Sequence, residues 1–202
     1  FRALDDVTFD VEIGQTIGVL GHNGSGKSTL LKCIAGTIRP TTGEVSVRGR
    51  LSALLELGAG FHPDLTGREN VYLNGSILGF SHRRIDEIFD DIVEFSELRD
   101  FIDSQVKHYS SGMYARLGFA VAVNLEPDVL LVDEVLSVGD EAFQRKCLER
   151  IRGFQEQGRT ILLVSHSPDQ VRQFCDRAVV LHRGRVLFDG DPGEAAARYR
   201  RS

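Results

Sequence analysis

The chain has 202 residues, of which 42% are hydrophobic and 26% charged, as in ordinary globular proteins with a sizeable core. Its formal net charge of −5 argues against a surface built to bind nucleic acid. No apolar run approaches the roughly 18 residues that a membrane span requires. We therefore expect no nucleic-acid partner, no membrane span and no signal peptide.

The three cysteines, Cys33, Cys147 and Cys175, lie in stretches of periodic apolar residues. This placement predicts buried free thiols. Their odd number and wide spacing do not suit a disulfide framework or a metal site. Reduced thiols are typical of the cytoplasm.

The first part of the chain predicts strands around one glycine-rich turn. Alternating residues over 7–11 predict a half-buried strand, and the apolar run over 16–20 predicts a buried one. A helix is expected over 28–35, with its apolar residues on one side. Further strands are predicted over 44–47 and 51–55.

The middle of the chain predicts helices. Thr66 and Glu69 form a capping-box pattern that opens a helix to about residue 78. A second helix is expected to start at Ser81, and a third covers about 112–125.

The last part alternates strands with helices, which is typical of a largely parallel sheet. An uninterrupted apolar run here predicts a strand that is buried on both faces. The predicted elements are, in order, a strand over 129–132, a helix over 140–157, a strand over 160–164, a helix begun by Ser167 and Pro168, a hairpin over 178–188 and a short helix capped by Asp191.

Residues 21–29 (GHNGSGKST) fit the phosphate-binding pattern G-x-x-x-x-G-K-[ST] between a predicted strand and a predicted helix. The glycines let backbone N–H groups curl around a phosphate, and the helix end adds partial positive charge. Lys27 is expected to reach the outer phosphates, and the Ser28 hydroxyl to ligate Mg²⁺. The residues expected to bind the nucleotide are Gly21, Asn23, Gly24, Ser25, Gly26, Lys27, Ser28 and Thr29.

Asp133, Glu134 and His166 directly follow two other buried strands, where an α/β sheet places its ligand crevice. We expect Asp133 to hold Mg²⁺ through water and Glu134 to orient or deprotonate the attacking water. His166 is expected to sense the terminal phosphate; a capping histidine is the alternative.

Ser110, Ser111 and Gly112 stand at the start of a predicted helix. Serines and a glycine in this position predict either a second anion site or a plain serine N-cap. The local residues alone favour the N-cap.

These motifs together make the chain similar to the nucleotide-binding domain of ABC transporters over almost its whole length. The motifs that carry the resemblance are, in order, GHNGSGKST at 21–29, YSSGM at 109–113, VLLVDE at 129–134, SVGD at 137–140 and SH at 165–166.

The resemblance implies an ATPase that uses ATP and Mg²⁺. It implies that two copies sandwich ATP, so that the phosphate loop of one copy faces Ser110, Ser111 and Gly112 of the other. It further identifies Glu134 as the catalytic base, His166 as the switch histidine and SVGD as the D-loop. ATP would close the dimer because it binds the closed state preferentially.

The fold class that follows is α/β, with a P-loop NTPase core, a mostly parallel sheet, an antiparallel N-terminal β part and an inserted helical subdomain. We expect one ABC ATPase domain over residues 1–202. Residues 1–63 and 126–202 would form the α/β core, and residues 64–125 the helical subdomain.

A narrower resemblance, to the ATPases of polysaccharide exporters, rests on residues 58–75, 109–122 and 133–147. It implies export of lipid-linked O-antigen, capsule or teichoic-acid type glycans, together with integral membrane permease subunits. The chain would then be peripheral, on the cytoplasmic face of the inner (plasma) membrane. The alternatives are an ABC ATPase for a lipid or drug, or a soluble ABC-type ATPase acting on DNA or ribosomes.

The sequence departs from the family pattern at three places. Ser111 and Met113 stand where many relatives have glycine and glutamine. The glutamine of the Q-loop, a metal-site residue, is absent, and Glu56 is the nearest polar candidate. The sequence does not identify the aromatic residue that stacks on adenine.

Overall fold

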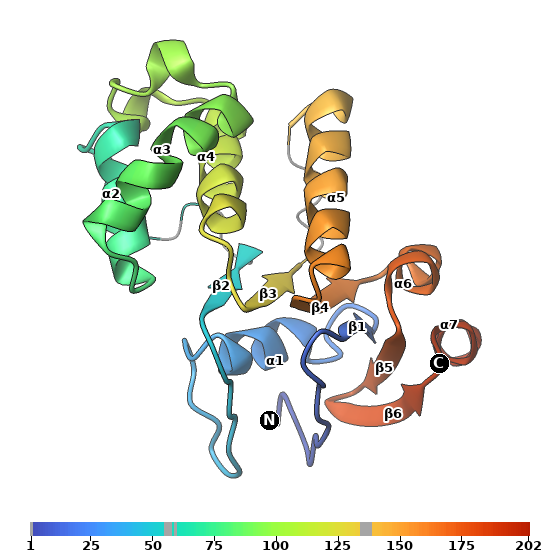
Figure 1. The fold of residues 1–202 in the computed structure, drawn as a ribbon. Coiled ribbons are helices and arrows are strands. Elements are labelled where there is room, and N and C mark those ends of the chain that lie inside the picture. Colours follow the sequence, from blue (N-terminus) through green and yellow to red (C-terminus); the bar gives the residue numbers. More distant parts are fainter. Residues whose placement is uncertain (1, 55–57, 59, 134–138) are drawn as a thin grey trace. The chain divides into compact units, whose positions relative to one another are not determined.

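The computed structural model describes residues 2–54, 58, 60–133 and 139–202 (Figure 1). The chain divides into two compact units. The first unit comprises Phe1–Leu51, Asp128–Glu134 and Ile151–Ser202. The second unit comprises Ser52–Pro127 and Val135–Arg150.

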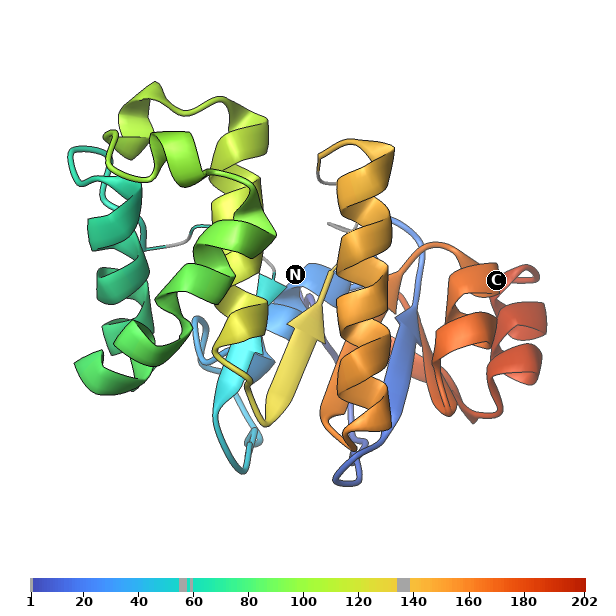
Figure 2. The same ribbon diagram turned by 45° about the horizontal axis from the view of Figure 1, so that its top comes forward.

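The sheet of the first unit is mostly parallel (Figures 1 and 2). The β3–β4, β4–β1 and β1–β5 pairs are parallel, whereas β5 and β6 form an antiparallel hairpin. Every residue of β1 and β4 is buried, which explains why both strands read as continuous apolar runs. The strands lie in the order β3 (Val129–Val132), β4 (Thr160–Ser165), β1 (Thr16–Leu20), β5 (Arg177–His182) and β6 (Arg185–Gly190).

The helices of the first unit are α1 (Lys27–Ile34), α6 (Pro168–Phe174) and α7 (Pro192–Tyr199). α6 begins where the Ser167 side chain accepts a hydrogen bond from the Gln170 N–H, and α7 begins at the Asp191 cap. The α7 residue Tyr199 packs with Leu20 of β1 in one apolar cluster. β2 (Leu51–Ala53) starts at the last residue of the first segment of this unit.

The second unit is a helical bundle around α2 (Gly67–Ile77), α3 (His82–Ser96) and α4 (Ser111–Asn124). α5 (Glu141–Glu156) begins in this unit, and η2 (Arg99–Phe101) and η3 (Val106–His108) are short 3-10 turns. Ile85 and Ile92 of α3 and Leu117 and Val121 of α4 are fully buried and form its core. Among the helices that the structure describes, none has the length and apolarity to cross a membrane.

The predicted α/β class with a mostly parallel sheet is confirmed, and most element boundaries fall within one or two residues of those predicted. The cysteines are free thiols, as expected; Cys33 and Cys147 are buried as predicted, whereas Cys175 is only half-buried. Burial raises the pKa of Cys147 and of Cys175 to about 12, so these thiols are poor nucleophiles at neutral pH.

The strand predictions for 7–11 and 44–47 are wrong, since neither segment is assigned as a strand. Residues 7–11 do alternate between half-buried and exposed, but no neighbouring strand pairs with them in the structure as described. Residues 44–47 are exposed throughout, so no buried face fixes a strand there. The expected antiparallel N-terminal part is therefore absent from the described strands, whose antiparallel pair is β5–β6.

Thr66 caps α2 with the predicted capping box. Its Oγ1 accepts from the Glu69 N–H at 3.1 Å, and Glu69 Oε2 accepts from the Thr66 N–H at 2.8 Å. Glu69 Oε2 also accepts from the Thr66 hydroxyl at 2.9 Å, and the two hydrogen bonds that this carboxylate accepts, from the Thr66 N–H and the Thr66 hydroxyl, lower the pKa of Glu69.

We expect Thr66→Ala to lower the free energy of unfolding by about 1 kcal/mol because the helix loses its cap. Thr66→Ser, which keeps the hydroxyl, should retain most of that stability. Urea denaturation followed by circular dichroism measures both variants. Equal stability of Thr66→Ala and the parent would contradict the prediction.

Candidate nucleotide-binding site

The loop between β1 and α1 has the backbone of an anion site. Gly24 and Gly26 adopt φ values of 79° and 108°, which glycine reaches without a steric cost. Gly26 is the N-cap of α1 and, because glycine has no side chain, it offers no capping acceptor to the start of this helix. The first N–H groups of α1 have no acceptor within the helix and are oriented to receive a ligand.

Gly21 and Gly26, the two glycines of the phosphate-binding pattern, are both required by close packing, and Gly26 is also required by its left-handed φ. A Cβ on Gly26 would lie 2.7 Å from the Ala3 carbonyl oxygen, and one on Gly21 would lie 2.7 Å from the Leu181 carbonyl oxygen. A Cβ on Gly24, in contrast, would meet no atom within 4 Å. Backbone carbonyl groups therefore pack closely against the loop at Gly21 and Gly26, whereas the space beside Gly24 is open.

Lys27 is held by the loop that precedes it. Its side chain is 9% exposed, and Nζ donates to the Gly21 carbonyl at 2.5 Å and to the His22 carbonyl at 3.1 Å. The ammonium group thus lies against the turn, where it adds positive charge to the helix end.

Ser25 supplies a buried hydroxyl at the same turn. Its Oγ has no hydrogen-bond partner among the described residues, although its carbonyl accepts from the Gly184 N–H at 2.8 Å. Burying an unpaired hydroxyl is costly, and a phosphate oxygen would satisfy it. With the uncapped helix start and the open glycine, this group makes the loop fit a phosphate.

The sheet register brings the other predicted first-unit residues to the same edge. Leu20 pairs with Ser165, so Gly21 and His166 leave neighbouring parallel strands at their carboxyl ends. Val132 pairs with Leu163 on the other side of β4, so Asp133 also leaves the sheet there. This edge is where open α/β sheets bind ligands.

His166 is exposed, and its neighbour Ser165 is buried. Ser165 Oγ donates to Gln170 Oε1 at 2.9 Å and accepts from the Ser167 N–H at 3.0 Å. These bonds fix the turn from β4 to α6 and thereby the backbone on which His166 stands. Asp133 is half-buried. Glu134 and Glu56 lie outside the described residues.

Ser110, Ser111 and Gly112 lie in the second unit, at the start of α4. Ser110 is the N-cap and accepts from the Met113 N–H at 3.1 Å. Both serines are exposed. Within a single chain the arrangement is thus the plain N-cap that the local residues favoured.

The preceding residue, Tyr109, anchors this segment because its hydroxyl donates to the Phe101 carbonyl at 2.7 Å. Burial raises the pKa of Tyr109 to about 12, so the phenol stays protonated as a donor.

Two contacts of the loops were not predicted. The exposed His22 ring stacks on Tyr199 of α7, with ring centroids 4.5 Å apart. Tyr114 of α4 donates to the Gly58 carbonyl at 2.9 Å. Neither contact leaves a local sequence signal, since the partners are far apart in the chain.

Comparison with known proteins gives the class. A family model described as "ABC transporter" matches residues 4–137. The chain therefore belongs to the ABC transporter family.

Several curated proteins are similar to this chain over nearly its whole length. The chain is 53% identical to the ABC transporter protein AbcA of Aeromonas salmonicida over 98% of its length. It is 46% identical to the O-antigen export system ATP-binding protein RfbB of Klebsiella pneumoniae, over 100% of this chain and 82% of that protein. It is 48% identical to the teichoic acids export ATP-binding protein TagH of Enterococcus faecalis, over 99% of this chain and 44% of that protein.

The fold is shared with solved structures. An ATP-binding subunit of an ABC transporter superposes with a TM-score of 0.86 at 28% identity, covering 98% of this chain and 87% of that one. A dimeric ATP-binding cassette bound to ADP and phosphate superposes with a TM-score of 0.79. The chain spans 65% of AbcA and 45% of the RfbB protein of Myxococcus xanthus.

Alanine substitutions at two adjacent residues of the loop should have different effects on the free energy of unfolding. Ser25→Ala removes a buried hydroxyl without a partner and should leave the free energy of unfolding equal or raise it by about 1 kcal/mol. Gly26→Ala forces a side chain into a left-handed conformation against Ala3 and should lower it by about 1–3 kcal/mol. Chemical denaturation without nucleotide tests the pair, and a larger loss for Ser25→Ala would refute it.

Proposed function

We propose that this chain is the ATP-binding and ATP-hydrolysing subunit of a bacterial ABC exporter for lipid-linked polysaccharide of the O-antigen, capsule or teichoic-acid type. The phosphate loop carries the ATPase part, because its uncapped helix, open glycine and unpaired hydroxyl suit a phosphate. The cargo is supported by the names of relatives that are 46–48% identical over the whole chain.

The phosphates would bind along the loop. Backbone N–H groups of residues 23–29 and the Ser25 hydroxyl donate to phosphate oxygens, and Lys27 moves from the loop carbonyls to the outer phosphates. The exchange costs little because the ammonium already lies at the turn.

Mg²⁺ would be held by the Ser28 hydroxyl, by Asp133 through water and by Glu56 at the Q-loop position. When bound there, Mg²⁺ would supply positive charge that offsets the negative charge of the phosphates during transfer. In the part of the chain that the structure describes, no three His, Cys, Asp or Glu side chains form a metal cluster. A magnesium ion that takes part of its ligands from ATP does not need such a cluster.

For hydrolysis, Glu134 is proposed as the general base toward the attacking water, and His166 as the residue that stabilises the terminal phosphate. Both follow strands whose carboxyl ends lie at the edge occupied by the phosphate loop. A positioned base contributes about 10²–10⁴-fold to a rate.

The complete site is proposed to form between two copies, with Ser110, Ser111 and Gly112 of one copy at the ATP of the other. The two serines are exposed and Gly112 is half-buried, so the serines are accessible to a partner. Integral membrane permease subunits would hold the dimer at the cytoplasmic face of the membrane. ATP binding would close the dimer, and hydrolysis would open it.

Substitutions at Lys27 and Glu134 should separate binding from turnover. Lys27→Ala should weaken ATP binding by about 10- to 100-fold because a charged donor is lost. Glu134→Gln should bind ATP normally but hydrolyse it about 100-fold more slowly or worse. Equilibrium dialysis with labelled ATP and a phosphate-release assay measure the two effects, and retained hydrolysis by Glu134→Gln would reject the assigned base.

The cargo is tested in cells that lack the protein. A polyprenyl-linked glycan should accumulate while surface polysaccharide falls, as measured by mass spectrometry of extracted lipids. Complementation with Glu134→Gln should not restore export, whereas the parent gene should. If neither pool changes, the polysaccharide assignment is refuted while the ATPase assignment stands.

A further inference from the structure

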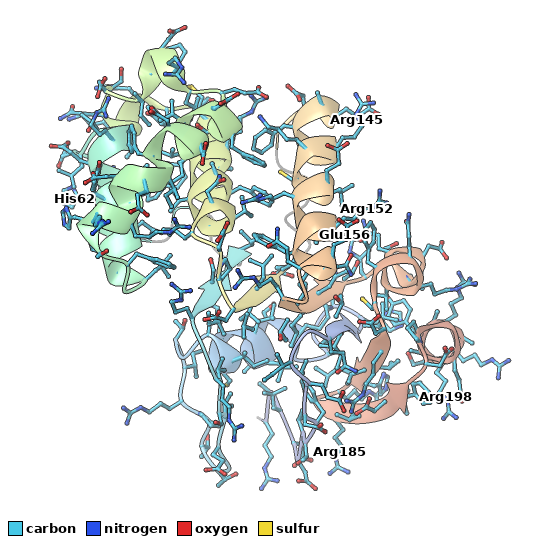
Figure 3. All side chains as sticks on the ribbon, viewed as in Figure 1. His62, Arg145, Arg152, Glu156, Arg185 and Arg198 are labelled. Atoms are coloured by element: carbon cyan, nitrogen blue, oxygen red, sulfur yellow. The ribbon has the colours of Figure 1, made fainter. Side chains whose placement is uncertain are left out.

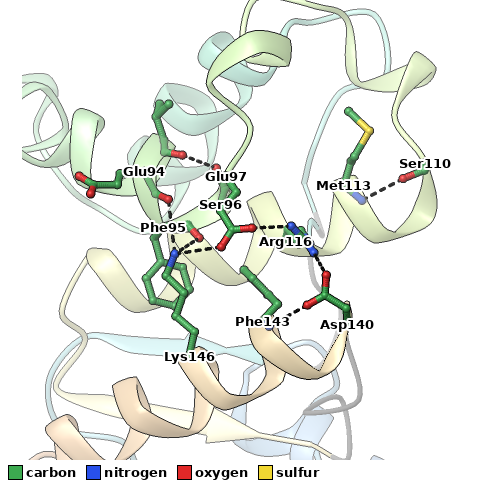
Figure 4. Close-up of polar contacts among 11 residues, drawn as sticks. Glu94, Phe95, Ser96, Glu97, Ser110, Met113, Arg116, Asp140, Phe143 and Lys146 are labelled. Atoms are coloured by element: carbon green, nitrogen blue, oxygen red, sulfur yellow. Dashed lines mark hydrogen bonds and ion pairs between the residues drawn. The ribbon is translucent and has the colours of Figure 1, made fainter.

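Arg116 joins three helices of the second unit (Figure 4). It lies in the second turn of α4, with 19% of its side chain exposed. Its Nη1 is 2.9 Å from Glu97 Oε2, and its Nη2 is 2.7 Å from Asp140 Oδ2. One planar guanidinium thus binds two carboxylates that come from segments before and after its own helix.

At Asp140 the two carboxylate oxygens have separate partners. Oδ1 accepts from the Phe143 N–H at 2.9 Å and so caps the start of α5, while Oδ2 binds Arg116. The Phe143 N–H and the Arg116 charge both lower the pKa of Asp140. The guanidinium also lies 4.9 Å from the centroid of the Phe143 ring, which adds a cation–π contact.

At Glu97 the contacts reach the end of α3. Glu97 is the C-cap of α3, and its φ of 60° is a left-handed conformation that is uncommon for residues other than glycine. Its Oε2 binds Arg116, while Oε1 lies 3.4 Å from Lys146 Nζ. Lys146 also donates to the Phe95 carbonyl at 3.0 Å. Positive and negative side chains therefore alternate along the network Lys146–Glu97–Arg116–Asp140.

This network is attached to the turn that carries Ser110. α4 runs from Ser111 to Asn124, and Arg116 lies one helical turn beyond Met113, whose N–H is capped by Ser110. A helix transmits a constraint rigidly over one or two turns. The contacts of Arg116 therefore constrain this turn from its C-terminal side, in addition to the bond from Tyr109 to the Phe101 carbonyl on its N-terminal side.

The helices themselves do not depend on these charges for their packing. α3 and α4 share an apolar core, and partly exposed ion pairs contribute little to stability. Losing Arg116 should therefore leave the bundle folded while it frees the first turn of α4 from the ends of α3 and α5.

We propose that Arg116 is a positioning residue for the second half of the ATP site, because it holds the Ser110–Gly112 turn in register with Asp140 for pairing with a second copy of the chain. The proposal rests on the proposed function, in which Ser110–Gly112 meets the partner's ATP. Arg116 is proposed to act through this turn and not by contact with ATP or the reacting atoms.

The test measures ATP-dependent dimerisation in the Glu134→Gln background by sedimentation velocity, together with ATP binding by dilute protein. Arg116→Met should raise the dimer dissociation constant about tenfold. It should leave ATP affinity of the single copy within about twofold, because the phosphate loop is unchanged. In the parent background, kcat should fall more than the KM for ATP changes.

Conservative and coupled variants separate positioning from folding. Arg116→Lys, which reaches one carboxylate at a time, should give an intermediate loss. Asp140→Asn keeps an oxygen for the cap and removes the charge, and combining it with Arg116→Met should add little to the single variant. These two variants also decide the question if Arg116→Met does not fold.

Arg68→Met is the matched control. Arg68 Nε lies 2.7 Å from Asp103 Oδ1, and the guanidinium lies 4.6 Å from the centroid of the Phe89 ring. The variant therefore loses an ion pair and a cation–π contact of the same kind, but elsewhere in the second unit. It should dimerise as its parent does.

The inference is overturned if Arg116→Met and Asp140→Asn dimerise with ATP as tightly as Arg68→Met does. If the Glu134→Gln parent itself binds no ATP, the proposed function fails, and this inference fails with it. A parent that binds ATP but does not dimerise overturns the role in pairing and leaves the ATP site intact.

Discussion

The constraint on which the first unit depends is the close approach of backbone to backbone behind the phosphate loop. The Ala3 carbonyl lies where a side chain on Gly26 would be, and it lies equally close to a side chain position on Gly184. The Ser25 carbonyl accepts from the Gly184 N–H. The N-terminal segment, the loop and the β5–β6 turn therefore fix one another, and only glycine permits contacts this close. Arg185, labelled in Figure 3, extends the same contact by binding Asp5.

That constraint gives the loop a fixed backbone that suits the phosphate proposed to bind there. The left-handed Gly26 starts α1 without a capping side chain, so the first N–H groups of the helix stay available. The Lys27 ammonium group already lies at the turn, and the Ser25 hydroxyl has no hydrogen-bond partner among the described residues. Little reorganisation remains to be done on binding, which is how a preorganised site gains affinity.

In the second unit, ion pairs orient a helix end, whereas in the first unit close backbone contacts fix the phosphate loop. Its apolar core holds α2, α3 and α4 together, but an apolar core does not select one orientation of a helix end. Arg116 supplies that selection, because a guanidinium that binds two carboxylates has a narrow range of geometry. The same unit also carries Tyr114, whose hydroxyl ties α4 to the loop at Gly58. α4 is thus the element on which the contacts of this unit converge.

The sequence by itself determined the elements that rest on local chemistry. The capping box of Thr66, the proline start of α6 and the buried runs of β3 and β4 each leave a local pattern, and each prediction was confirmed. It misplaced strands over 7–11 and 44–47. The alternation over 7–11 records exposure and not the presence of a pairing strand, whereas residues 44–47 are exposed throughout and have no buried face. Only the tertiary structure decided that Arg116 meets Glu97 and Asp140, and that His22 meets Tyr199. Such contacts join residues far apart in the chain, and their partners are chosen by how the helices pack, for which a linear pattern carries no signal.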